Sequence, residues 1–237
     1  MRRIAVIVAC EGEESDAFFE RWGRSNKVYE GEYEVFSYRE ILKDEEVLLA
    51  ISGAGLVDAA SATQYVIDKF APEVIIKVGL VSGATEKEKL GEVYLVEGAI
   101  DASYNITVFG NKPGQHTGSE QIEWANRVMT KGLAKELGLE TRIGATTNYF
   151  VKDTKAKKAL GDGMNKGELR KLYPEVGVFD MEDAAVARVC RRNEVPCVMI
   201  AGVSDEYLSG SETYVKMAPV VSREGLVPVL EGVLENL

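Results

Sequence analysis

The 237-residue sequence is poor in the residue types that build metal centres and disulfide frameworks. It has one histidine and three cysteines, Cys10, Cys190 and Cys197, and the cysteine spacing fits no metal-binding pattern. We therefore expect reduced cysteines in the core of a cytoplasmic protein, with no metal and no cofactor. The histidine, His116, falls in a predicted loop. We interpret it as a solvated residue, the alternative being a contact to a neighbouring subunit's ligand.

Long apolar runs and an excess of basic charge are also absent. No apolar run reaches the roughly 20 residues that a membrane-spanning helix needs. The basic, apolar start of the chain runs directly into Glu11 without the cleavage pattern of a signal peptide, so we interpret it as a buried strand. Lys and Arg number 28 against 38 Asp and Glu, a net charge of −10, which argues against nucleic acid as a partner. A small nucleoside remains compatible with this charge.

What the sequence does contain is an alternation of strand and helix patterns along its whole length, without a linker or repeat. Such alternation predicts an α/β fold, here a single domain over residues 1–237 with a mixed, mostly parallel central sheet flanked by helices. The expected strands are residues 3–9, a hairpin over 28–38, 46–51, 74–81, 93–100, 106–109, 141–147 and 196–203. The expected helices are residues 15–22, 56–70, 119–138, 182–193 and a tail from 211 that Pro219 and Pro228 interrupt.

Two acids are placed where such a sheet binds ligands. Glu182 opens a predicted helix, and Asp205 follows the carboxyl end of an apolar strand. Two carboxylates from separate elements suggest acid–base chemistry on a small polar ligand, although helix capping accounts for each one singly. Lys77 lies inside an apolar run, and we interpret it as a sheet-edge lysine whose amine reaches water, with an anion contact as the alternative. The turn at 52–55 is neither a dinucleotide fingerprint nor a Walker A loop.

These pieces together resemble the purine nucleoside phosphorylase superfamily, and within it the 5′-methylthioadenosine/S-adenosylhomocysteine nucleosidases. The resemblance covers nearly the full length. It is carried by the acidic turn at 10–14, the turn at 52–55, the strand and turn at 74–83, the segment 106–115, Met181-Glu182-Asp183-Ala184 and Val203-Ser204-Asp205. The turn at 79–83 reads Gly-Leu-Val-Ser-Gly where these nucleosidases usually have Gly-Ser-Ala-Gly-Gly, and Cys10 stands where they usually have methionine.

The resemblance implies roles for individual residues. Glu13 corresponds to the carboxylate that activates water, and Asp205 to the acid that protonates the leaving purine. The implied substrate-binding residues are Glu182 at the ribose hydroxyls, Met181 under the sugar, Phe150 and Val151 at the base, Gly79, Leu80 and Ser204 around them, and Phe109 and Pro113 lent across a dimer interface.

The implied function is hydrolysis of a purine nucleoside in a homodimer or dimer-based oligomer. The alternatives are a phosphate-dependent nucleoside phosphorylase and a non-catalytic nucleoside-binding relative. The acid in the first turn and the lack of a Gly-Asp-Pro phosphate turn favour hydrolysis, because a carboxylate there suits water and repels phosphate.

Overall fold

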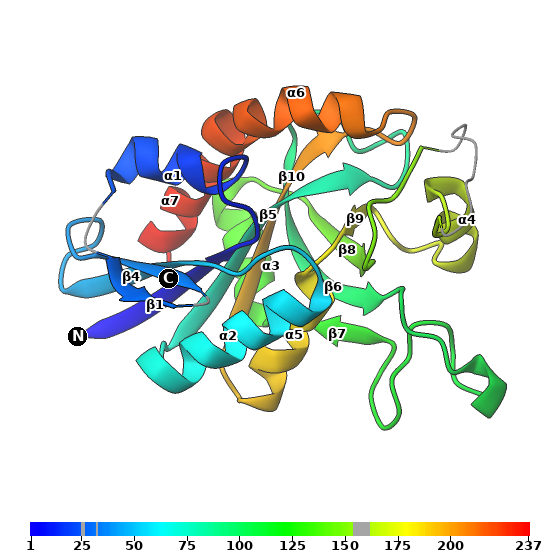
Figure 1. Ribbon diagram of the computed structural model, residues 1–237, viewed down its shortest axis with the longest axis horizontal. Helices are drawn as coiled ribbons and strands as arrows, with labels where there is room; N and C mark the ends of the chain where they lie inside the picture. Colours follow the sequence, from blue (N-terminus) through cyan, green and yellow to red (C-terminus); the bar gives the residue numbers. More distant parts are fainter. Residues whose placement is uncertain (25–26, 32, 154–161) are drawn as a thin grey trace.

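The structure, a computed structural model, describes residues 1–24, 27–31, 33–153 and 162–237. Within these residues ten strands form one sheet with helices packed on both of its faces (Figure 1). The strands are β1 (Arg2–Val8), β2 (Lys27–Glu30), β3 (Glu34–Tyr38), β4 (Glu45–Ile51), β5 (Val74–Gly83), β6 (Val93–Asp101), β7 (Ile122–Trp124), β8 (Thr141–Thr146), β9 (Val178–Asp180) and β10 (Cys197–Asp205). The helices are α1 (Ser15–Trp22), α2 (Leu56–Phe70), α3 (Arg127–Leu137), α4 (Lys166–Leu172), α5 (Asp183–Arg192), α6 (Ser211–Val221) and α7 (Val227–Glu235), with a 3-10 helix at Thr107–Phe109 and a π-helical segment at Ser222–Leu226.

The sheet is mixed, as predicted. Its strand order is β10-β6-β8-β9-β5-β1-β4-β3-β2, and β10 also pairs with β5, so five of the strands close into a ring. Among the described pairings five are parallel and five antiparallel, where mostly parallel pairing was expected. The antiparallel share comes from the β2–β3–β4 hairpins, from β7, and from the pairings that close the ring.

Alternation along the strands builds the core on both faces of the sheet. In β1, Ile4, Val6 and Val8 pack with α1, α3, α6 and α7, whereas Ala5 and Ile7 pack with α2 and α5. This is the period of two expected for a strand covered on both sides. None of the helices in the described ranges is long and apolar enough to cross a membrane.

Three local predictions differ from the structure. Residues 106–109 were expected as a strand, but they find no partner strand and form the 3-10 helix, which ends at Gly110. The helix expected over 119–138 is divided: β7 pairs with β6 beside Gly98, and α3 starts after Asn126, whose side chain accepts the Met129 N–H. A Cβ at Gly98 would lie 2.7 Å from the Ile122 side chain, so glycine makes this pairing possible.

The third difference is Pro219, which was expected to break the tail helix. It lies inside α6, and the backbone continues through the π-helical segment into α7, where Pro228 occupies the first turn. A wider π turn absorbs the local loss of helical hydrogen bonds, so the chain stays helical.

The sheet brings several strand ends to one place. Strands β1, β5 and β10 run parallel, so their carboxyl ends lie at one edge. Strand β9 runs antiparallel to the last residues of β5, pairing Phe179 with Ser82. The residues that follow β1, β9 and β10 therefore meet near the end of β5.

Candidate active site

A cavity of about 230 Å³ lies where these strand ends meet. Of the residues predicted from the sequence, seven line it: Leu80, Phe150, Val151, Met181, Glu182, Ser204 and Asp205. Its other lining residues include Cys10, Glu14, Ser82, Tyr149 and Tyr214. Four acidic residues thus line one cavity: Glu14 after β1, Asp180 and Glu182 at the end of β9, and Asp205 at the end of β10. Within the described ranges no cluster of histidine, cysteine and acidic side chains is arranged to hold a metal ion.

The acidic turn after β1 contributes Glu14 to the cavity, not Glu13. Glu13 is exposed and does not line the cavity, whereas Glu14 is 4% exposed. The N–H groups of Ala9 and Cys10 donate to Glu14 Oε2 at 2.7 and 3.1 Å, and the Leu80 N–H donates to Oε1 at 2.9 Å. The turn therefore directs Glu14, the acid after the one that the resemblance implied, back toward the end of β1.

The position of Glu182 depends on Asp180. Asp180 accepts hydrogen bonds from the Glu182 N–H at 2.7 Å and from the Asp183 N–H, so it satisfies the first amides of α5. Thr146 Oγ1 donates to the other Asp180 oxygen at 2.6 Å and accepts the Ala184 N–H at 2.9 Å. Because Asp180 caps the helix, the Glu182 carboxylate is free to bind elsewhere. Its Oε1 accepts the Gly55 N–H at 2.8 Å.

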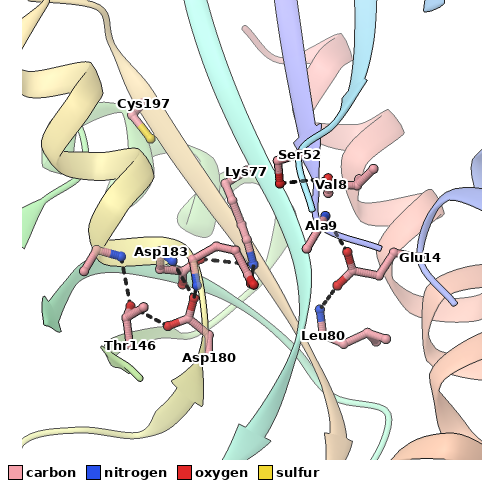
Figure 2. A network of polar contacts seen from close by, with 12 residues as sticks. Val8, Ala9, Glu14, Ser52, Lys77, Leu80, Thr146, Asp180, Asp183 and Cys197 are labelled. Carbon is pink, nitrogen blue, oxygen red and sulfur yellow. Dashed lines mark hydrogen bonds and ion pairs between the residues drawn. The ribbon is translucent and has the colours of Figure 1, made fainter. Parts of the chain in front are cut away.

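Lys77 is the buried cation behind these carboxylates. Its side chain is 1% exposed in the middle of the sheet, so the prediction of a sheet-edge lysine reaching water was wrong. Its Nζ lies 3.2 Å from Asp183 Oδ1 and 3.6 Å from Glu182 Oε2, and Figure 2 shows Lys77 between the Asp180–Asp183 group and Glu14. Gly79 does not line the cavity but leaves room for this amine, because a Cβ there would lie 2.1 Å from Lys77 Nζ.

The charges in this cluster shift its protonation. Burial opposes the charged form of Lys77, but the carboxylates of Asp183, Glu182, Asp180 and Glu14 together raise its pKa well above the ordinary value. Burial raises the pKa of Glu182 to about 7, with Lys77 opposing and Asp180 and Glu14 adding to the rise. Burial and Asp180 likewise raise the pKa of Asp183. Burial beside one shared cation therefore leaves the carboxyls of Glu182 and Asp183 with pKa values raised toward neutral pH.

Asp205 is held by a residue that the sequence analysis missed. Lys166 Nζ donates to Asp205 Oδ2 at 2.6 Å, and Ser82 Oγ donates to the same oxygen at 2.6 Å. Burial raises the pKa of Asp205, while Lys166 opposes the rise. Lys166 belongs to a segment rich in polar residues, and yet its side chain is 0% exposed. No sequence pattern distinguishes it from Lys152 and Lys171, which are exposed.

Aromatic side chains form the outer part of the cavity. The ring of Phe150, 38% exposed, meets that of Tyr214 edge-on, with 5.5 Å between their centroids. Aromatic rings beside buried carboxylates suit a ligand with an aromatic ring and a polar sugar.

Phe109 and Pro113 lie on a loop outside this cavity. The loop projects from the end of β6 (Figure 1), and Phe109 is 79% exposed. His116 belongs to the same loop but is not simply solvated: its ring stacks on Tyr104 at 3.7 Å, and its Nε2 lies 2.8 Å from Asp101 Oδ2. These contacts anchor the loop while its tip stays exposed.

Comparisons with known proteins agree with the fold. The model of the phosphorylase superfamily matches residues 3–224, and the chain belongs to this superfamily. It is 31% identical to the 5′-methylthioadenosine/S-adenosylhomocysteine nucleosidase of Tolumonas auensis, over 82% of this chain and 85% of that protein. It is 30% identical to the nucleosidase of the same name from Bacillus pumilus, over 74% of each chain.

Solved structures share the fold over the full length. The nucleosidase of the same name from Neisseria meningitidis, in complex with methylthio-immucillin-A, has a TM-score of 0.86 at 24% identity and covers 100% of both chains. A futalosine hydrolase mutant from Helicobacter pylori has a TM-score of 0.87 at 17% identity, with the same coverage.

Proposed function

We propose that the protein is a nucleosidase that hydrolyses the N-glycosidic bond of a purine nucleoside, such as 5′-methylthioadenosine or S-adenosylhomocysteine, and releases adenine. The observation that carries this proposal is the convergence of Glu14, Glu182 and Asp205 on one cavity. The names of the relatives at 30–31% identity support the reaction and the substrate class.

The three carboxyl groups divide the work of the reaction. Breaking the bond builds positive charge on the ribosyl carbon and negative charge on the base, so a base that activates water and an acid at the leaving group are both needed. Glu14 takes the water role that the sequence analysis gave to Glu13, because it is the acid of that turn that faces the cavity. Asp205, a buried acid whose pKa is raised, donates the proton to the purine.

The remaining lining residues hold the substrate. Glu182 accepts hydrogen bonds from the ribose hydroxyls, with Met181 packed beneath the sugar. Phe150 stacks on the base, and the Val151 backbone reads the edge of the base. All four line the cavity.

The contacts of Glu14 favour water over phosphate as the attacking group. Its carboxylate already accepts the N–H groups of Ala9, Cys10 and Leu80, which are the kind of donors that cradle an anion. A phosphate bound at these N–H groups would have to displace the Glu14 carboxylate, and its own negative charge would then be buried beside that carboxylate. The phosphorylase alternative therefore lacks a site for its second substrate at this end of the cavity.

The test is product analysis. The purified protein is incubated with a panel of purine nucleosides, with and without phosphate, and the products are separated by chromatography. Free base and free sugar formed at a rate independent of phosphate support the proposal. A sugar 1-phosphate would identify a phosphorylase, and binding without turnover would identify a non-catalytic relative.

The assembly we propose is a homodimer, or a larger oligomer built from dimers. Val108 and Phe109 are 83% and 79% exposed at the tip of a loop that Tyr104 and His116 anchor. Exposing an aromatic ring and a valine side by side is unfavourable in water, and a partner's surface relieves it. In a two-fold dimer the loop of each subunit brings Phe109 and Pro113 to the cavity of the other subunit.

A further inference from the structure

Lys166 occupies a position that two physical rules disfavour. It is the first residue of α4, after the cap Asn165, where the helix dipole disfavours a positive charge. Its side chain is also completely buried, which is rare for lysine. A residue that breaks local rules while bonded to an acid that lines a cavity points to a functional constraint.

The contacts of Lys166 Nζ account for its burial. Nζ donates to Asp205 Oδ2 at 2.6 Å and to the backbone carbonyls of Glu206 at 2.6 Å and Ser209 at 2.8 Å. These are as many acceptors as an ammonium has protons. The backbone N–H of Lys166 donates to the Lys152 carbonyl at 3.1 Å, which ties α4 to the segment that carries Phe150 and Val151.

The same contacts leave the two oxygens of Asp205 in different environments. Oδ2 receives both the Lys166 ammonium and the Ser82 hydroxyl. Among the residues that the structure describes, Oδ1 has a single long contact, to Ser204 Oγ at 3.4 Å. Oδ1 is therefore the oxygen with free capacity toward a ligand in the cavity.

We propose that Lys166 is a positioning residue for the leaving-group acid: it holds Asp205 through Oδ2, presents Oδ1 to the nucleobase, and stabilises the carboxylate that Asp205 becomes. This inference rests on the nucleosidase function proposed above. As the bond between the ribosyl carbon and the base nitrogen breaks, its electron pair goes to the base. The Oδ1–H bond breaks and an N–H bond forms on the base, which leaves a carboxylate paired with the ammonium. Water adds to the ribosyl carbon and gives its proton to Glu14.

The electrostatics of the pair agree with this role. Burial raises the pKa of Asp205, and Lys166 opposes that rise. Burial lowers the pKa of Lys166, and Asp205, Asp153 and Glu206 oppose the decrease. An acid whose conjugate base is stabilised by a fixed cation gives up its proton more readily than one buried alone.

The experiment compares Lys166→Met with the wild-type protein over a range of pH. Loss of the ammonium lowers kcat by about 10–100-fold, because the carboxylate product loses a charge-assisted hydrogen bond, while KM stays within about 3-fold. Asp205 must be protonated to act, so activity falls on the alkaline side as it ionises. Without Lys166 its pKa rises, and the alkaline limb moves up by about one pH unit or more. The matched control is Lys171→Met, on the exposed side of the same helix, which keeps the wild-type kcat and profile.

Each result decides the matter. A lower kcat with the alkaline limb at its wild-type pH shows a structural role only and overturns the inference, as does wild-type behaviour of Lys166→Met. If Lys166→Met does not fold, the test is the protonation state of Lys166 in the wild-type protein, followed through the ¹⁵N resonance of its Nζ over the same range of pH. The resonance is assigned because it is lost in Lys166→Arg. An ammonium that persists through the alkaline limb supports the inference, and one that titrates together with activity overturns it. Wild-type turnover in Asp205→Asn, or no release of base from any nucleoside, would instead overturn the proposed function.

Discussion

Replacing Lys77 by methionine removes the one cation that, among the described residues, directly contacts Glu182 and Asp183. Methionine keeps the unbranched shape of lysine, so the change is mainly one of charge. Lys77 Nζ is 3.2 Å from Asp183 Oδ1 and 3.6 Å from Glu182 Oε2, and the side chain is 1% exposed. Removing one partner of a buried ion pair costs about 3–5 kcal/mol. For a domain of this size each kcal/mol lowers Tm by about 2–4 °C, so we expect a decrease of about 6–20 °C near pH 8.

The decrease in Tm caused by Lys77→Met should become larger as the pH rises. Both carboxyls already have folded-state pKa values above their unfolded values, Glu182 at about 7 and Asp183 at about 8, and loss of Lys77 raises them further. A carboxyl whose pKa is raised by folding contributes stability that is fully present at pH values below its pKa in the unfolded state. This contribution is lost as the pH rises through its pKa in the folded state. The difference in Tm between wild type and Lys77→Met therefore widens from pH 5 to pH 8.

Thermal unfolding followed by circular dichroism at several pH values measures this effect. Lys69→Met, at an exposed position on α2, is the matched control and should change stability by no more than about 0.5 kcal/mol. An unchanged Tm in Lys77→Met at pH 8, or a deficit of equal size at pH 5 and pH 8, would refute the view that Lys77 balances the buried carboxylates.

Four further outcomes follow from the site. Glu14→Gln should lower kcat by about 10²–10⁴-fold in steady-state assays while Glu13→Gln stays near wild type, and the reverse pattern would return the water role to Glu13. Asp205→Asn should lose at least about 10²-fold in turnover while nucleoside binding, measured by calorimetry, persists; near-normal turnover would reduce Asp205 to a structural residue. KM should fall as pH rises through about 7, where Glu182 becomes the stronger, charged acceptor, and a flat KM profile from pH 6 to 8 would contradict this. Mixing Phe109→Ala with Asp205→Asn protein should restore partial activity through one intact hybrid site, and no rescue despite subunit exchange would rule out the shared site.

The strands and helices of the core were predictable because their signal is local. In β5 and β10 every residue is buried, and both read in the sequence as largely apolar runs. The helix after Glu182 was predicted from its spacing, and α5 occupies Asp183–Arg192. Predictions failed where pairing with a distant strand competes with local preference, as in β7 beside Gly98, or where no partner strand exists, as at Thr107–Phe109.

The cavity was predictable in part for the same reason. Ser204 and Asp205 end β10, and Met181 and Glu182 connect β9 to α5, so their place at the sheet edge follows from the elements themselves. Glu13 was predicted to act on water, but Glu14 is the acid that faces the cavity. The order of residues along a turn does not determine which side chain the turn directs inward.

The sequence by itself determined an α/β chain with a central sheet, acids at the strand ends, and the family to which it belongs. The tertiary structure decided the partners of these acids. Lys166 looks like other lysines in the sequence, and the apolar run around Lys77 does not reveal its partners. Only the closure of the sheet and the packing of α4 bury them against Glu182, Asp183 and Asp205. The physical reason is that hydrophobic periodicity is encoded over a few neighbouring residues, whereas a buried ion pair joins residues up to 106 apart and exists only after the chain has folded around it.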